Sequence, residues 1–304
     1  MRIRLDIAYD GTHFRGWAKQ PGLRTVQGTI EAALARIVGP AAAASDGGNP
    51  DAGDPGCGEP GAAGPRLIVA GRTDAGVHAT GQVAHVDLDA RQWARVQSRN
   101  GRAANDPAAS LASRIRGVLG QYPDVTVSRT SLAPEGFDAR FSAVWRRYRY
   151  RLADTRAGYD PLLRHDTTTV RAALDEGAMD ASAQTLIGLH DFAAYCKPRE
   201  EGTTIRTLLD YRWTRDAAGV LVAEVKADAF CHSMVRALVG ACAAVGEGRL
   251  EIADVARLRD DLTRTSAFKV LAARGLTLTE VGYPPDDLLA ARAEQTRNRR
   301  DQDD

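Results

Sequence analysis

The chain has 304 residues, of which 44% are hydrophobic and 26% charged, and its formal net charge is +1. This composition is typical of a globular protein, and the length is sufficient for two domains with separate cores. No apolar run is long enough to span a membrane, and residues 1–4 lead directly into a strand pattern, so we expect a cytoplasmic protein without a signal peptide. The small net charge neither favours nor excludes a nucleic-acid partner, because cationic residues can still cluster locally.

The four cysteines are scattered along the chain, and no two of them form a Cys-x-x-Cys pair. Only one has a neighbouring histidine, and that spacing carries no information about a metal. The sequence therefore predicts neither a disulfide framework nor a zinc site. The cysteines are Cys57, Cys196, Cys231 and Cys242.

The first half of the chain alternates between strand and helix patterns. Apolar residues at every second position predict a strand over 3–9. Thr25 is a suitable N-cap for a helix that ends at the Gly-Pro pair 39–40. Further strands are predicted over 67–69, 83–88 and 125–127, with a helix over 111–119 before the last. Two polar stretches, 39–65 and 91–106, predict flexible loop insertions.

The second half repeats this order of elements. Aromatic and cationic residues alternate over 147–152, which predicts a strand with one aromatic and one cationic face. A helix, two strands, a long apolar helix over 234–245 and a last strand from Leu276 follow. We predict an α+β fold of two similar split-βαβ domains, with antiparallel sheets around a central active-site cleft. The predicted domains cover 1–140 and 141–290, and the charged residues 291–304 are expected to form a disordered tail.

Asp74 is the first candidate for chemistry. It follows a predicted buried strand and lies on a sharp turn between Gly71 and Gly76, with Arg72 two residues away. A nearby guanidinium keeps a carboxylate ionised, which suits a nucleophile or a general base. The alternative is an ordinary turn in which Asp74 caps backbone N–H groups.

Two further residues are candidates for the same site. Tyr148 lies on the alternating strand, where an aromatic side chain can equally pack in the core. Arg236 comes two positions after Met234, about 200° around a helix, so it faces away from the apolar stripe formed by Met234, Leu238 and Cys242. Arg236 can therefore face a cleft, or remain a solvated surface arginine.

Several segments resemble the motifs of one family, the tRNA pseudouridine synthases of the TruA type. Residues 70–79 read AGRTDAGVHA, with Gly-Gln-Val at 81–83, and are similar to the active-site motif of that family. Ala18 departs from the family pattern, which usually has glutamine there. Other matching segments are YDGTHFRGW at 9–17, FDARFS at 137–142, RRYRY at 146–150 and FCHSMVR at 230–236.

The resemblance implies isomerisation of uridine to pseudouridine at positions 38, 39 and 40 of the tRNA anticodon stem-loop, by a homodimer without cofactor or metal. It implies that Asp74 is the catalytic carboxylate, as nucleophile or base, that Tyr148 stacks on the target base, and that Arg236 pairs with Asp74. Leu276 resembles the apolar wall of the uracil pocket. The candidate RNA contacts are Arg72, His78, Arg146, Arg147, Arg149, Arg151 and His232.

Two other classes of protein fit parts of the pattern. A non-catalytic RNA-binding protein of the same architecture would use the aromatic strand as a stacking platform, but it would not need Asp74, Tyr148 and Arg236 together. A hydrolase that combines Asp74 with His78 or His232 would need a second acid or a metal set nearby, and the sequence shows neither. The sequence therefore favours the isomerase.

Overall fold

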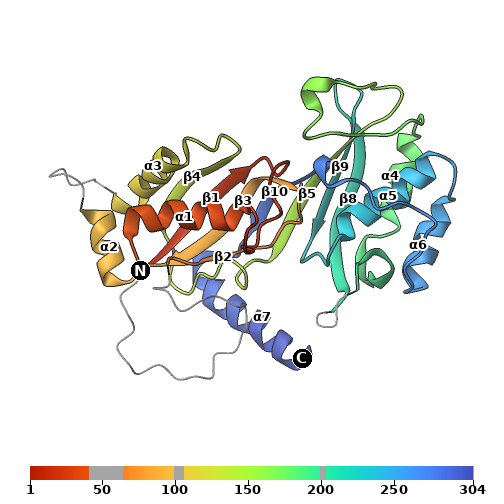
Figure 1. Ribbon diagram of the computed structural model, residues 1–304. Helices are drawn as coiled ribbons and strands as arrows, with labels where there is room; N and C mark the ends of the chain where they lie inside the picture. Colours follow the sequence, from red (N-terminus) through yellow and green to blue (C-terminus); the bar gives the residue numbers. More distant parts are fainter. Residues whose placement is uncertain (41–63, 99–105, 199–202, 304) are drawn as a thin grey trace.

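A ten-stranded sheet forms the centre of the protein, in a computed structural model that describes residues 1–40, 64–98, 106–198 and 203–303 (Figure 1). Two short strands lie off the main path, β2 (Leu67–Val69) beside β3 and β6 (Thr168–Thr169) beside β5. The main path runs β4 (Val125–Leu132), β1 (Arg2–Tyr9), β3 (His78–Asp87), β10 (Leu276–Gly282), β5 (Trp145–Ala153), β9 (Leu221–Ala227), β8 (Ile205–Arg215) and β7 (Gly188–Asp191).

Strand β10 joins the two halves of the chain into one sheet. It pairs parallel with β3, where Leu278 is opposite Ala79, and antiparallel with β5, where Leu278 is opposite Tyr148. The other pairs along the main path are antiparallel. The structure therefore confirms a mixed α+β fold with a large, mostly antiparallel sheet, whereas a division into two similar domains stays a prediction.

The helices pack against this sheet and against one another. Helix α1 starts where the sequence predicted, because the Thr25 hydroxyl accepts a hydrogen bond from the Gly28 N–H. It ends at Gly39, which adopts a φ of 72°. The helices are α1 (Val26–Val38), α2 (Ala90–Gln97), α3 (Pro107–Leu119), α4 (Glu176–Gln184), α5 (Met234–Gly246), α6 (Ile252–Asp260) and α7 (Leu289–Asp303). Four 3₁₀ turns are η1 (Pro161–Leu163), η2 (Ala193–Tyr195), η3 (Ala273–Gly275) and η4 (Asp286–Leu288).

Helices α1 and α5 lie over opposite ends of the sheet (Figure 1). Alternate residues of β1 and β5 are buried, as the period-two patterns predicted. Helix α5 is buried along almost its whole length, and Arg236 is its one residue that is not. In the part of the chain that the structure describes, no helix is both long and apolar enough to cross a membrane.

Two of the predicted irregular segments contain helices, so those predictions were wrong. The stretch 91–106 includes most of α2, which begins at a capping box formed by Asp89 and Gln92. The tail 291–304 falls mostly within α7, which buries Leu289 and Ala293 and whose Arg297 pairs with Asp138 at 3.0 Å. In both cases the polar sequence makes contacts with distant parts of the chain, since Gln92 and Arg95 of α2 donate to the carbonyls of Gly39 and Val38. Most of the other predicted insertion, residues 41–63, lies outside the described residues, as do 99–105.

Candidate active site

Buried hydrogen bonds fix the turn that carries Asp74. The hydroxyl of Tyr9, at the end of β1, lies 2.7 Å from the hydroxyl of Thr73, and the Trp17 N–H donates to the Thr73 carbonyl at 3.0 Å. Gly16 permits this approach, since a Cβ there would lie 3.1 Å from that carbonyl and its φ is 90°. The backbone of residue 73 is therefore fixed directly before Asp74.

Gln82 of β3 completes this support. Its side-chain amide donates to the Gly71 carbonyl at 2.9 Å and to the Tyr9 hydroxyl at 3.3 Å. Burial raises the pKa of Tyr9 to about 12, so the phenol keeps its proton and remains available as a donor to Thr73. Neither Tyr9 nor Gln82 was predicted from the sequence to support the turn.

Two cationic or protonatable side chains approach the Asp74 carboxylate, one from the loop before α5 and one from the first turn of α5. His232 Nε2 lies 3.6 Å from Asp74 Oδ1, and Arg236 Nη1 lies 4.0 Å from Asp74 Oδ2. The Arg236 Nε also donates to the Leu271 carbonyl at 2.7 Å, which fixes the plane of the guanidinium. The Asp74 side chain stays 36% exposed, so the carboxylate has His232 and Arg236 on one side and access to a ligand on another.

Tyr148 of β5 is 8% exposed. Leu278 and Val225 lie opposite it on the two neighbouring strands, β10 and β9. Its ring meets the ring of Phe230 edge-on, with centroids 5.1 Å apart. Burial raises the pKa of the Tyr148 hydroxyl, and the negative charge of Asp74 adds to this, so the group remains a neutral phenol. Phe230 was not identified from the sequence as a partner of Tyr148.

His78 and Leu276 lie close to these residues in the fold but have other partners. The Nδ1 of His78 accepts from the Gly11 N–H at 2.9 Å, and its Nε2 lies 3.0 Å from the Arg274 carbonyl. The same Nδ1 also lies 3.0 Å from Asp10 Oδ1. His78 therefore ties the loop after β1 to η3. Leu276 is opposite Tyr150 in the β5 ladder, whereas Leu278 is the residue opposite Tyr148.

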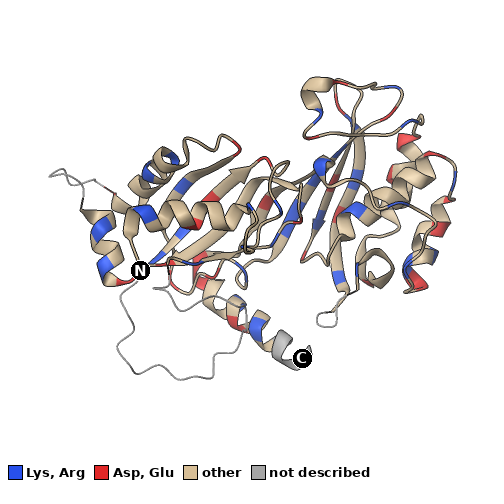
Figure 2. Ribbon diagram, viewed as in Figure 1, with Lys and Arg blue, Asp and Glu red and all other residues tan. Residues whose placement is uncertain are grey.

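Arg147 and Arg149 point to the face of the sheet opposite Tyr148, because side chains alternate along β5. Arg147 pairs there with Glu224 at 3.4 Å and with Glu280 at 3.3 Å. Figure 2 shows basic and acidic segments on neighbouring strands of the sheet. The structure therefore does not bring these two arginines to Asp74, and their contact with RNA stays a prediction.

Arg72, by contrast, is exposed on the Asp74 turn itself. Within the described residues its side chain makes no hydrogen bond or ion pair, so the guanidinium is available to a ligand. The same part of the chain contains no group of three or more histidine, cysteine or acidic residues that could hold a metal ion.

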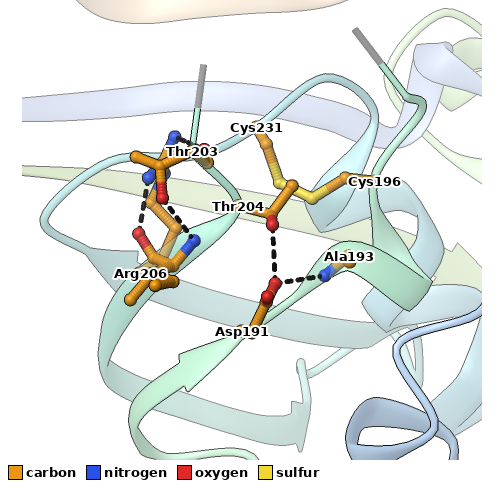
Figure 3. The surroundings of a disulfide bond; sticks show 8 residues. Asp191, Ala193, Cys196, Thr203, Thr204, Arg206 and Cys231 are labelled. Carbon is orange, nitrogen blue, oxygen red and sulfur yellow. Dashed lines mark hydrogen bonds between the residues drawn. A yellow bond between two sulfur atoms is a disulfide. The ribbon is translucent and has the colours of Figure 1, made fainter. Parts of the chain in front are cut away.

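A disulfide joins Cys196, after η2, to Cys231 in the loop before α5 (Figure 3). The prediction that the cysteines form no disulfide was therefore wrong, because a pair 35 residues apart gives no local signal in a sequence. The adjacent Lys197 N–H donates to the His232 carbonyl at 2.9 Å. The disulfide and this hydrogen bond together fix the backbone next to His232, whose side chain faces Asp74.

Known proteins similar to this chain share one description. A family model described as tRNA pseudouridine synthase matches residues 182–284. A tRNA pseudouridine synthase A from Leifsonia xyli subsp. xyli is 59% identical over 300 residues, which cover 98% of this chain and 97% of the relative. The chain belongs to the tRNA pseudouridine synthase A family. Relatives of the same name from Streptomyces griseus subsp. griseus and Mycobacterium leprae are 48% and 42% identical, and cover 98% and 99% of this chain and 93% and 96% of their own.

The match to the pseudouridine synthase family model includes His232, Arg236 and Leu276, whereas Asp74 and Tyr148 precede it. Similarity to the full-length synthases covers both groups of residues, because it spans nearly the whole chain. The resemblance that the motifs indicated is thus confirmed at the level of the family.

Proposed function

We propose that the protein isomerises uridine to pseudouridine at positions 38, 39 and 40 of the tRNA anticodon stem-loop. The observation that carries this proposal is the meeting of Asp74 with His232 and Arg236 beside the buried ring of Tyr148, in a chain of the tRNA pseudouridine synthase A family. Isomerisation breaks the bond from C1′ to N1 of the uracil and forms a bond from C1′ to C5. C5 then loses its proton, and N1 gains one. No electrons or groups are exchanged with another molecule.

Each residue then has a defined task. Asp74 supplies the carboxylate, as the nucleophile or as the base that removes a sugar proton. Arg236 fixes the orientation of this carboxylate, with His232 at its other oxygen. Tyr148 stacks on the target base after it leaves the RNA stack, which offsets an unstacking cost of a few kcal/mol. Arg72 binds RNA next to the carboxylate.

A transcript assay tests the proposal. The pure protein is incubated with an unmodified tRNA transcript without cofactor or added metal, and pseudouridine is mapped by carbodiimide-stop sequencing. We expect stops at positions 38–40 with the native chain and none with Asp74→Asn, which should still bind the transcript. Asp287→Asn, at an exposed acid of η4, is the matched control and should keep full activity. Binding without stops from the native chain would favour the non-catalytic RNA-binding alternative.

A homodimer is the second part of the proposal, and it is supported by the family resemblance alone. One tRNA would then contact both subunits, so that the subunit whose Asp74 acts need not make every RNA contact. Sedimentation equilibrium of the free protein measures the mass directly. We expect twice the mass of one chain, and the mass of a single chain at working concentration would refute the dimer. The cytoplasmic location likewise stays a prediction.

A further inference from the structure

Arg146 lies at the start of β5, two residues before Tyr148, and donates hydrogen bonds to three backbone carbonyls. Its Nη2 donates to Ala70 at 2.7 Å and to Arg140 at 3.2 Å, and its Nη1 donates to Asp228 at 2.8 Å. These acceptors come from three connections that are distant in the chain. Arg146 was predicted from the sequence to be a phosphate contact, whereas in the structure its half-buried guanidinium donates to the protein's own backbone.

Two of these carbonyls belong to the residues at which two active-site segments begin, the turn that carries Asp74 and the loop that leads to α5. Ala70 directly precedes the turn that carries Asp74, and its N–H is held by the Val83 carbonyl at 2.9 Å. Asp228 directly follows β9 and opens the loop that leads through Phe230 to α5. One guanidinium therefore connects the origin of the Asp74 turn with the origin of the loop that carries its partners.

The second loop is anchored at this same point. The Asp228 carboxylate accepts from the Thr207 N–H at 3.0 Å and from the Ala229 N–H at 2.6 Å, so its carbonyl has a fixed direction. A Cβ on Gly71 would lie 3.9 Å from the Arg146 Nε, so the guanidinium runs alongside the first residue of the Asp74 turn as well. Movement of either loop would break hydrogen bonds at a planar, rigid donor.

We propose that Arg146 is a positioning residue that sets the separation between Asp74 and its partners His232 and Arg236. The role rests on the proposed function, because it concerns the geometry of that site. An ammonium has one nitrogen and cannot replace a planar fork that donates from two nitrogens to the carbonyls of Ala70 and Asp228. Misplacement of a catalytic group by about 1 Å can cost about 100-fold in rate.

Arg146→Lys tests this role, and Arg116→Lys is its matched control. Arg116 also binds two backbone carbonyls, those of Val127 and Ser128 at 2.8 and 3.1 Å, but it lies on α3, away from the site. At saturating enzyme we expect the single-turnover rate of Arg146→Lys to fall about 100-fold with the tRNA Kd changed less than about twofold. Arg116→Lys should keep the native rate.

Two kinetic or binding results would overturn the proposal. The first is a native single-turnover rate in Arg146→Lys. The second is a loss confined to Kd, together with a salt dependence of log Kd that is shallower by about one, which would identify Arg146 as a phosphate contact. Guanidinium chloride at millimolar concentration, compared with equal sodium chloride, should partly restore the rate of Arg146→Ala by refilling the vacated donor position.

Amide hydrogen exchange gives a readout that does not require activity. Arg146→Lys should speed exchange in both 71–77 and 229–233, and Arg116→Lys in neither, because Arg146, unlike Arg116, donates hydrogen bonds at the start of both loops. If the native chain forms no pseudouridine, the proposed function fails, and exchange still decides the role of Arg146. Unchanged exchange in both segments would overturn that role.

Discussion

Arg236 approaches the Asp74 carboxylate to 4.0 Å while its Nε is hydrogen-bonded to the Leu271 carbonyl at 2.7 Å. The guanidinium thus has one side fixed by the backbone and the other directed at the carboxylate. Helix α5 is buried almost throughout, and Arg236 is its one incompletely buried residue. The helix acts as a rigid support for one cationic group.

Arg236→Lys should therefore lower kcat about 100-fold and leave KM for tRNA nearly unchanged. Lysine has a single nitrogen, which cannot both bind the Leu271 carbonyl and reach Asp74 in a fixed geometry. Steady-state kinetics on a tRNA transcript measure both constants. Arg264→Lys, at an exposed arginine after α6, should behave as the native protein. A higher KM with native kcat would instead show that Arg236 binds RNA.

Arg72→Gln should weaken tRNA binding without lowering thermal stability. The side chain is exposed and makes no hydrogen bond or ion pair within the described residues, so its loss leaves no buried partner unsatisfied. Removal of one phosphate contact should reduce the slope of log Kd against log salt by about one. Filter binding at several salt concentrations and a melting curve test both points. An unchanged slope would mean that Arg72 contacts a base or sugar instead.

Local chemistry made much of the site predictable. Glycines around Asp74 indicated the turn, and the angle of about 100° per helical residue placed Arg236 opposite the apolar stripe. Strand alternation likewise separated Tyr148 from the arginines on the other face of β5. The hydrogen bonds of Arg146 to Ala70 and Asp228 could not be predicted, because these two of its three acceptors lie 76 and 82 residues away in the chain.

Helix α2 shows a different limit of sequence reasoning. It buries only Gln92 and Val96 at positions i and i+4, so its apolar face is too short to produce a visible period in a polar stretch. The capping box at Asp89 was the available signal. The continuous sheet also depends on tertiary pairing, since β10 inserts between strands from two halves of the chain that were predicted to form separate domains.

Gly81→Ala should destabilise the protein and reduce its activity. A Cβ at Gly81 would lie 2.0 Å from the Thr279 carbonyl, so β3 and β10 would have to separate where the sheet joins both halves of the site. We expect a loss of about 2 kcal/mol in the free energy of unfolding, within the usual range for overpacking. Urea denaturation measures this change.

Gly117→Ala is the matched control for Gly81→Ala. Gly117 is exposed within α3, and a Cβ there meets nothing within 4 Å. Alanine favours the helix over glycine by about 0.5–1 kcal/mol, so this variant should be more stable than the native chain and equally active. Similar destabilisation of both variants would contradict the close approach of β3 and β10.

His85 should make stability depend on pH between about 6.5 and 4. Burial lowers the pKa of its imidazole to about 4, and the positive charge of Arg2 acts in the same direction. Its Nδ1 accepts the Ala139 N–H at 3.0 Å, which also requires a neutral ring. The unfolded chain, with an ordinary histidine pKa near 6.5, binds more protons in this range than the folded chain.

Stability should consequently be complete above pH 6.5 and decline as the pH falls towards 4, by on the order of 3 kcal/mol. His85→Gln isolates the effect, because the amide oxygen can still accept the Ala139 N–H but does not titrate. Urea denaturation of both proteins across this range should give a steeper loss of unfolding free energy for the native chain. Parallel curves would show that His85 does not carry a depressed pKa. A loss that both proteins share and that begins only below pH 4 would assign the acid sensitivity to carboxylates such as Asp154, whose pKa is lowered by hydrogen bonds that outweigh its burial, above all those from Arg215.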